Sequence, residues 1–382
     1  MSTIKGGEKA IEASHRLIAK RRRGDRSFDE MSVAQIREQL TLAVDRVMAE
    51  GGLYDPTLAA LAIKQAEGDL SEAIFLLRAF RATLPRFGFT SPVDTAAMTV
   101  RRRISTTHKD VPGGQILGLT YDYTHRLLDF GLMEAGEDRE GVLPEDDEAS
   151  DDDIFRQADI LTRDVGSLAA SDALETELPG DDSDVADLTR DSLSFPSRRD
   201  QRLQNLAQGD EGFLMSLCYS SMRGYGSNHP FVGELRHGDV TVSMEIPEIG
   251  IEVGMGAIRV TECRTIHIFA GDPERPPGHT RGYGLIFGHG ERKAISMAVV
   301  DRALRGKEFG EEAQYPVQDE EFVLSHTDNV AASGLVQHLK LPHYVDFQAQ
   351  LQLLAQLRAT HAERYAAVPE EEPVIREPAH AG

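Results

Sequence analysis

The sequence predicts an α+β protein with an N-terminal helical bundle, a central mixed α/β core and a C-terminal helical segment that bears histidines. Apolar residues recur at helical spacing through residues 1–95, whereas the stretches from Val240 to Ile246 and between Ile251 and Phe269 alternate as strands do. A helix is expected from about Glu291 to Leu304. Because the strands and helices do not alternate as regular βαβ units, the pattern favours α+β over a doubly wound sheet.

Local helix signals place the elements of the bundle, which is expected over residues 1–95. Ser32 and Gln35 form a capping box ahead of an apolar-periodic run. Asp55 followed by Pro56 fits an N-cap with proline at the first helical position. Nothing in this part of the sequence demands chemistry.

The formal charge of −22 is concentrated in one segment. Residues 134–191 hold 21 acidic and 4 basic residues, a net charge of −17, so only −5 belongs to the rest of the 382-residue chain. This charge density predicts a disordered, self-repelling insert over 134–194. The other boundaries are expected at 96–133 and 195–320 for the core, 321–365 for a metal-binding histidine segment and 366–382 for a disordered tail.

The composition argues against several classes of protein. No apolar run approaches the ~20 residues that span a bilayer, and the first residues lack the apolar stretch of a secretory signal. The two cysteines, Cys218 and Cys263, are too few for a CxxC-type zinc site or a disulfide framework, which fits a reducing cytosol. We therefore expect a cytoplasmic protein that does not bind membrane. We also expect no nucleic-acid partner. Basic clusters such as Arg101–Arg103 can face phosphates or form solvated surface.

A glycine-rich run from Arg281 to Lys293 has the parts of a triphosphate site. Gly282 and Gly284 would let backbone N–H groups approach an anion, a helix N-terminus follows, and Arg281 and Lys293 add positive charge. The run matches neither the Walker A motif nor the Rossmann fingerprint. A tight glycine turn between a strand and a helix explains it as well.

Asp122, His125 and Asp129 in YDYTHRLLDF would share one face of a helix. A carboxylate beside an imidazole is suited to acid–base chemistry, so Asp122 and His125 are candidate catalytic residues. The alternative is a hydrogen-bonded helix surface.

His338 and His343 are candidate metal ligands, because imidazole suits Zn²⁺ or Fe²⁺. Pro342 lacks a backbone donor and pushes the residue before it out of the α region, so His343 is expected beyond the helix or turn that carries His338. A break between the two residues lets both rings converge on one ion. The alternative is a pair of hydrogen-bonded surface histidines.

Several long stretches of the chain resemble one known family, the I subunit (PhnI) of the carbon–phosphorus lyase core complex. The resemblance covers nearly the whole chain apart from the acidic insert and the C-terminal tail. Among the stretches that carry it are KGGEKAIEASHRLIAKRRRGD, SVAQIREQLTLAVDRVMAEGG, LAIKQAEGDLSEAIFLLRAFRATL, KDVPGGQILGLTYDYTHRLLDF, RGYGSNHPF, TRGYGLIFG, ERKAISMAVVDRAL and HLKLPHYVDFQAQLQLL.

The resemblance implies a role in bacterial phosphonate catabolism. With the G, H and L subunits, the family's subunit displaces adenine from ATP by methylphosphonate, giving α-D-ribose 1-methylphosphonate 5-triphosphate. Alone it is expected to act as a nucleosidase on ATP or GTP. The resemblance also implies a core with two copies each of the G, H, I and J subunits, and a metal, zinc, bound by His338 and His343 beside subunit J.

Replacing a purine at the anomeric carbon passes through an oxocarbenium-like state, so the leaving base needs a proton and the triphosphate needs to be held. Our hypothesis is that the run from Arg281 to Lys293 cradles the triphosphate of the substrate ATP and that an acidic side chain such as Asp122 serves the ribose or base. The competing hypothesis is a non-catalytic scaffold that organises the complex and supplies metal ligands at the interface with subunit J.

Overall fold

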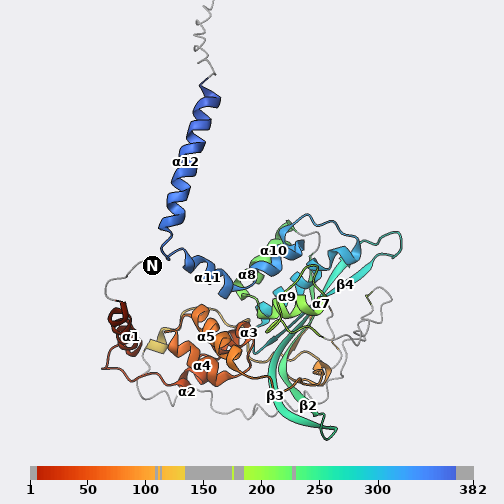
Figure 1. Ribbon diagram of the computed structural model, residues 1–382. Helices are drawn as coiled ribbons and strands as arrows, with labels where there is room; N and C mark the ends of the chain where they lie inside the picture. Colours follow the sequence, from red (N-terminus) through yellow and green to blue (C-terminus); the bar gives the residue numbers. More distant parts are fainter. Residues whose placement is uncertain are drawn as a thin grey trace, which may run out of the picture. The chain divides into compact units, whose positions relative to one another are not determined.

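The structure is a computed structural model, and it confirms the α+β class, with helices and a four-stranded antiparallel sheet (Figure 1). The chain divides into two compact units, Met1–Val330 and Ala331–Gly382. The described residues are 7–107, 111, 114–133, 174–175, 185–225 and 229–366.

The first helices form the expected bundle around small buried side chains. Ala59, Ala60 and Ala73 are fully buried, which lets the helices approach closely around Val47 and Leu77. Both expected N-caps are confirmed, and their side chains accept backbone N–H groups. The helices are α1 (Gly7–Arg23), α2 (Val33–Gln39), α3 (Thr41–Gly51), α4 (Pro56–Gln65) and α5 (Leu70–Thr83).

The sheet has the strand order β1-β2-β3-β4, and each neighbouring pair is antiparallel. The two expected alternating stretches are confirmed as strands, but β2 begins well before Val240 because residues 234–238 pair with β3 and are buried. The strands are β1 (Thr99–Ile104), β2 (Phe231–Ile246), β3 (Ile251–Phe269) and β4 (Gly278–Phe287).

Helix α9 (Glu291–Leu304) has the bounds that the sequence predicted, and it packs on β3 and β4 (Figure 1). Ten of its residues are buried, because it lies between the sheet and other helices. Cys263, on β3, is buried, and so is Cys218. The other described elements of this unit are α7 (Arg199–Gln208), α8 (Glu211–Ser220), a π-helical turn (Ser221–Tyr225), short 3-10 turns (Thr95–Ala97, Phe130–Met133, Gly306–Phe309, Pro316–Gln318) and α10 (Glu320–His326).

Arginine side chains join the bundle to the core. Arg78 on α5 donates to the carbonyl of Glu50 at 2.8 and 2.9 Å, to the carbonyl of Gln208 at 3.2 Å and to Asp328 at 2.6 Å. Arg46 on α3 bonds Asp210, the N-cap of α8, at 3.1 Å. These bonds satisfy the carbonyls at the end of α3 and hold it against α7 and α8.

Part of the predicted acidic insert lies among the described residues. Leu174 forms an isolated bridge with His279, and Glu175 forms an ion pair with the buried Arg305. Residues 185–194 are also described, and Asp187 pairs with Arg86. The rest of the insert lies outside the described residues, as does the predicted tail from residue 367 onward.

The second unit contains most of α11 (Asn329–His338) and all of α12 (Tyr344–Tyr365). The expected break at Pro342 is confirmed, since His338 ends one helix and His343 precedes the next. No residue of α12 is buried. Among the described residues, no helix is long and apolar enough to span a membrane.

Candidate functional site

Asp122 and His125 lie in an irregular segment, and the expected helix through YDYTHRLLDF is wrong. Residues 121–129 contain no helix, so Asp122, His125 and Asp129 do not share a helical face. A tertiary bond explains the difference, because Asp122 Oδ2 accepts a hydrogen bond from Arg102 Nη2 at 2.7 Å. The His125 side chain is exposed. The structure therefore connects Asp122, but not His125, to the core.

Arg102 links Asp122 to helix α9. It lies on β1 with a side chain that is 2% exposed, and its Nε donates to Glu291 Oε1 at 2.5 Å. Its Nη1 donates to the carbonyl of Leu117. A buried guanidinium is stable only when its donors are satisfied, so Arg102 holds two carboxylates in fixed positions.

Glu291 also contacts a pair of stacked histidines. Its Oε1 lies 3.5 Å from Nε2 of His289, whose ring stacks on His237 with centroids 4.2 Å apart and planes 21° apart. His237 is buried on β2, and its Nδ1 lies 3.2 Å from both Val260 O and Thr261 Oγ1. We call these connected residues the histidine–arginine network: Asp122, Arg102, Glu291, His289 and His237.

The turn between β4 and α9 fixes the position of His289. Gly288 has a φ of 71°, and an added Cβ would lie 2.4 Å from Asp45 Cγ, so the turn requires glycine. Asp45 on α3 accepts the backbone N–H of His289 at 2.9 Å. Thr261 on β3 donates to the carbonyl of Gly288 at 2.6 Å and accepts the N–H of Gly290 at 3.2 Å. The backbone, not the imidazole, makes these contacts, so a change of the His289 side chain leaves them intact.

The network holds groups of different charge. Burial, together with the neighbouring charges of His289 and Arg259, lowers the pKa of His237 to about 3, so this ring is neutral. Burial by itself raises the pKa of Glu291, but the hydrogen bond with His289 and the charge of Arg102 outweigh it and bring the pKa below its ordinary value. An ionised carboxylate thus lies beside an imidazole, which is the pair that acid–base catalysis uses.

Sequence reasoning found only Asp122 of this network. Arg102 belongs to a basic cluster that solvated surface explains as well, and His289 lies in the glycine-rich run, where the glycines and cations carry the prediction. The available signal was Gly288-His289-Gly290 directly before a helix, which places an imidazole at a helix N-terminus. Nothing local indicated that His237 would stack on it, because that contact depends on the sheet.

The predicted phosphate-binding glycines lie in a strand. Arg281, Gly282 and Gly284 belong to β4, so these positions do not form the tight turn that the glycine-rich run also suggested. An added Cβ on Gly282 would lie 1.9 Å from Ala298 O, and one on Gly284 would lie 2.2 Å from Ala294 O. Both glycines therefore allow β4 to approach the backbone of α9.

Two backbone donors of β4 are already bonded to carboxylates. The N–H of Arg281 donates to Glu175 Oε2 at 3.0 Å, and the N–H of Tyr283 donates to Asp301 Oδ2 at 3.0 Å. An anion-binding nest uses successive N–H groups that point at the ligand. At these two positions the donors already have acidic partners.

Lys293 is buried between α9 and α3. Its side chain is 1% exposed, and among the described residues neither its Nζ nor Oε2 of Glu50 has a hydrogen-bond partner. Glu50 Oε1 accepts from Arg46 at 2.8 Å and from the N–H of Glu211 at 3.2 Å. Burial lowers the pKa of Lys293 to about 8, although the charge of Glu50 opposes this shift. The assignment of a triphosphate stays a prediction for Arg281, Gly282, Gly284 and Lys293.

His338 and His343 lie close together in the second unit. Their ring centroids are 5.2 Å apart, with planes at 75°. Nδ1 of His338 bonds the carbonyl of Leu335, and Nδ1 of His343 lies 2.6 Å from the carbonyl of Leu341. An imidazole held in this way has Nε2 left to coordinate a metal. Among the described residues, no group of three or more His, Cys, Asp or Glu side chains could hold a metal. Zinc binding by His338 and His343 stays a prediction.

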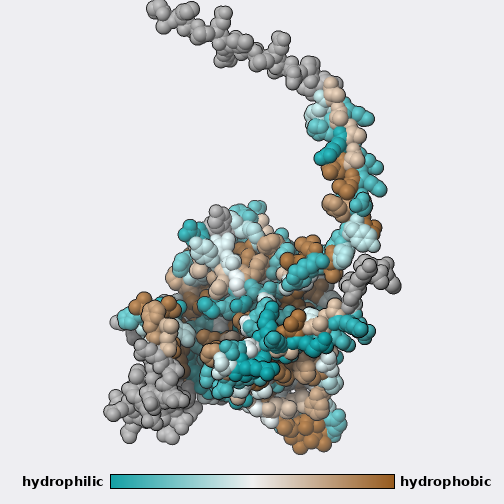
Figure 2. Space-filling model, turned by 90° about the vertical axis from the view of Figure 1, so that its left-hand side faces the viewer, coloured by the Kyte–Doolittle hydropathy of each residue, from teal (hydrophilic) through white to brown (hydrophobic). Residues whose placement is uncertain are grey.

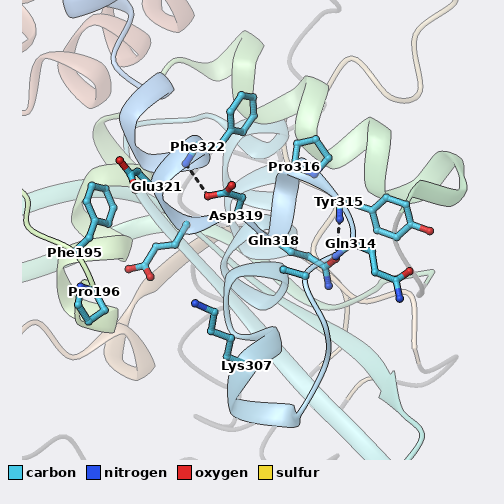
Figure 3. A pocket seen from close by; sticks show the side chains of 12 residues that line it. Phe195, Pro196, Lys307, Gln314, Tyr315, Pro316, Gln318, Asp319, Glu321 and Phe322 are labelled. Carbon is cyan, nitrogen blue, oxygen red and sulfur yellow. Dashed lines mark hydrogen bonds between the residues drawn. The ribbon is translucent and has the colours of Figure 1, made fainter.

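A separate pocket of ≈ 790 Å³ lies beside α10. Figure 3 shows Lys307 and the acidic side chains among its lining residues, with Asp319 accepting the N–H of Phe322 at 3.0 Å. The carboxylates of Asp319, Glu320 and Glu321 outnumber the single lysine, so this lining disfavours a triphosphate. None of its lining residues belongs to the histidine–arginine network.

Comparison with known proteins identifies the family. The model of the family described as "Bacterial phosphonate metabolism protein (PhnI)" matches residues 2–361. This chain belongs to the PhnI family. A Rhizobium meliloti relative named "Alpha-D-ribose 1-methylphosphonate 5-triphosphate synthase subunit PhnI" is 57% identical over 94% of this chain and 95% of its own length. An Escherichia coli relative with the same name is 52% identical over 93% of this chain and 97% of its own.

A third relative has a different name. It is the "Putative C-P lyase subunit protein HtxH" of Stutzerimonas stutzeri, 41% identical over 92% of this chain and 94% of its own length. The expected family is therefore confirmed, and with it a place in phosphonate metabolism as a subunit of the carbon–phosphorus lyase system.

Proposed function

We propose that this chain is the ribosyl-transfer subunit of an α-D-ribose 1-methylphosphonate 5-triphosphate synthase. The observation that supports this most strongly is the 57% identity, over 94% of the chain, to a protein with that name. In the reaction, the bond between C1′ of ATP and N9 of adenine breaks, and an oxygen of methylphosphonate forms the new bond to C1′. Adenine leaves with a proton. When water replaces methylphosphonate, the same subunit acts as a nucleosidase on ATP or GTP.

The histidine–arginine network supplies groups for this chemistry. His289 is the proposed general acid for the departing base, because its side chain is partly exposed and an ionised carboxylate lies next to it. Glu291 orients the imidazole, and Arg102 holds Glu291 in place. Asp122 has a half-exposed carboxylate at the outer end of the network, where it serves the hydroxyl groups of the ribose.

The test measures adenine release by chromatography and the sugar product by mass spectrometry, with ATP and methylphosphonate as substrates. We expect His289→Asn to lower kcat by about 10²–10⁴-fold, the usual contribution of a general acid. Glu291→Gln is expected to lower kcat less than His289→Asn does and to change the pH profile, because Glu291 positions the imidazole of His289. His15→Asn, an exposed histidine on α1, is the matched control. Unchanged kcat in His289→Asn would exclude the network as the active site, whereas no adenine release by the wild-type assembly would reject the function.

The assembly is part of the same proposal. The G, H and J subunits form the core with this chain, two copies of each, and the L subunit joins for the synthase reaction. The names of the relatives support a multi-subunit system, since they are called a synthase subunit and a C-P lyase subunit.

The second proposed role is to supply two zinc ligands to a site that a partner subunit completes. The observation that favours it is the His338–His343 pair, whose Nδ1 atoms face carbonyls and whose rings lie 5.2 Å apart. A bound Zn²⁺ would supply a Lewis acid or hold the interface with the partner.

Metal analysis of the purified assembly tests the zinc proposal. The double variant His338→Ala/His343→Ala is expected to lose about one zinc per chain and to abolish growth on methylphosphonate. His361→Ala, on the exposed helix α12, is the control and retains the metal. An unchanged zinc content in the double variant would rule out both ligands.

A further inference from the structure

The sheet extends into a two-stranded hairpin beyond its outer strands. We call residues 240–258 the hairpin arm, in which β2 pairs with β3 from Val240↔Ile258 to Ile246↔Ile251. Strand β4 pairs with β3 only from Val260 onward, and β1 reaches β2 only as far as Asp239. Among the described residues, the β3 side of the arm therefore has no neighbouring strand.

The arm exposes apolar side chains on both faces. Each residue from 251 to 257 is exposed, although successive side chains of a strand point to opposite faces. Ile249 is 61% exposed, Ile251 54% and Met255 56%. Figure 2 shows apolar residues gathered at the lower end of the molecule, at the level where Figure 1 draws the turn between β2 and β3.

A neighbouring segment adds to this apolar surface. The N–H of Ser91 donates to the carbonyl of Ser243 at 2.8 Å, which places the chain before it beside the β2 side of the arm. In that stretch Phe87 is 88% exposed and Phe89 71%. A two-stranded ribbon is only marginally stable in water, and contiguous exposed apolar side chains are typical of an interface.

The charge of the arm restricts what can cover it. Glu245, Glu248 and Glu252 are its only charged residues, so its net charge is −3. Two arms placed against each other would repel, and so would an arm and an anionic lipid surface. An apolar surface bordered by lysine and arginine is complementary to it.

We propose that the hairpin arm is the docking surface for a different protein subunit, one that presents an apolar strip bordered by Lys and Arg. The inference rests on the proposed function, because a synthase subunit works within an assembly. Ile249, Ile251 and Met255 enter the apolar strip, and the three glutamates pair with the basic border.

The test uses the full chain co-expressed with the other synthase subunits. The variant Glu245→Lys/Glu248→Lys/Glu252→Lys is expected to reduce co-purification of at least one subunit by tenfold or more. The control is Glu8→Lys/Glu12→Lys/Asp29→Lys, which makes the same charge change at exposed positions outside the arm and leaves assembly unchanged. Because Glu252 also bonds Ser243, the apolar variant Ile249→Ser/Ile251→Ser/Met255→Ser provides an independent test with the same expectation.

Hydrogen exchange locates the contact. The amides of residues 240–258 are expected to exchange at least tenfold more slowly in the purified assembly than in the isolated chain. Equal exchange in both, or normal assembly of both arm variants, would overturn the proposal. Dimerisation of the isolated chain through the arm would also overturn the proposal and would show that a second copy covers the arm. Flotation of the isolated chain with anionic vesicles would overturn it in favour of a lipid surface. Adenine release by the wild-type assembly is a separate readout, so failure of the docking proposal and failure of the proposed function are distinguishable.

Discussion

Replacing Lys293 by methionine is expected to stabilise the protein at neutral pH. Lys293 is 1% exposed, and its ammonium group has no hydrogen-bond partner among the described residues. The group therefore loses its hydration on folding without gaining hydrogen bonds in exchange. Methionine has a similar length and no charge. Buried charges that are retained at such a cost are often functional. The substitution therefore tests both the energetic cost of the buried charge and the functional role of Lys293.

The magnitude follows from the pKa of Lys293. Burial lowers it from 10.5 to about 8, a difference that corresponds to about 3 kcal/mol of unfolding free energy. Below pH 8 the lysine is protonated in both states, and the folded protein carries this cost. Between pH 8 and 10.5 the unfolded chain binds the proton and the folded chain does not, so the stability of the wild type rises with pH. The variant lacks this rise.

Loss of the lysine also removes a favourable charge next to Glu50, whose pKa burial already raises. The net gain for Lys293→Met is therefore expected at about 1–3 kcal/mol, and the double variant Lys293→Met/Glu50→Gln should gain at least as much. Urea unfolding at pH 7 and pH 10 measures the difference between each variant and the wild type. Lys307→Met, at an exposed position, is the control and should show no pH-dependent difference.

A variant that is less stable than the wild type at pH 7, or a difference that does not shrink toward pH 10, would refute this reasoning. The same protein tests the predicted triphosphate site. If Lys293→Met binds ATP with unchanged affinity, then Lys293 does not hold the triphosphate.

Three further substitutions test the packing by chemical denaturation. Gly284→Ala should lower the unfolding free energy by about 1–3 kcal/mol or more. The added Cβ would lie 2.2 Å from Ala294 O, and relieving this clash requires a shift of the backbone. Gly334→Ala has open space within a helix and should not destabilise, so an equal loss in both would contradict the close-packing explanation. Leu77→Ala should cost about 2–5 kcal/mol at a buried site in the bundle. Ser32→Ala removes the cap of α2 and should cost about 1 kcal/mol, with no loss if the cap is not formed.

Features set by neighbouring residues could be predicted from the sequence. The capping box of Ser32 and Gln35 and the Asp55–Pro56 helix start depend on contacts within one turn, and both are present. The break at Pro342 is equally local, since proline restricts the residue before it.

Features set by distant contacts could not be predicted. The stretch from Asp122 to Asp129 has helical periodicity, but an ion pair with Arg102 on a distant strand determines its path. Glycines such as Gly282 and Gly284 are typical of anion-binding backbone and of tight turns, whereas here they let β4 approach the backbone of α9. Which side of β4 would face that helix depends on the sheet register, and no short motif encodes it.

The candidate site shows the same division. His338 and His343 are close in sequence, and their proximity in space follows from one proline. His237 and His289 meet only because β2, β3 and the turn after β4 are assembled, and His289 is placed by Asp45 from the helical bundle. The sequence therefore predicted the proximity of His338 and His343, which only four residues separate. It did not predict the contact between His237 and His289, because two strands lie between them in the chain.

The burial of both native cysteines makes the chain convenient for site-specific labelling. Burial raises the pKa of the Cys218 and Cys263 thiols, so neither forms a reactive thiolate at neutral pH. A single cysteine introduced at Glu248, in the exposed turn of the hairpin arm, would react with a maleimide fluorophore without prior removal of the native thiols. The emission of that dye would report, in real time, when another protein covers the turn.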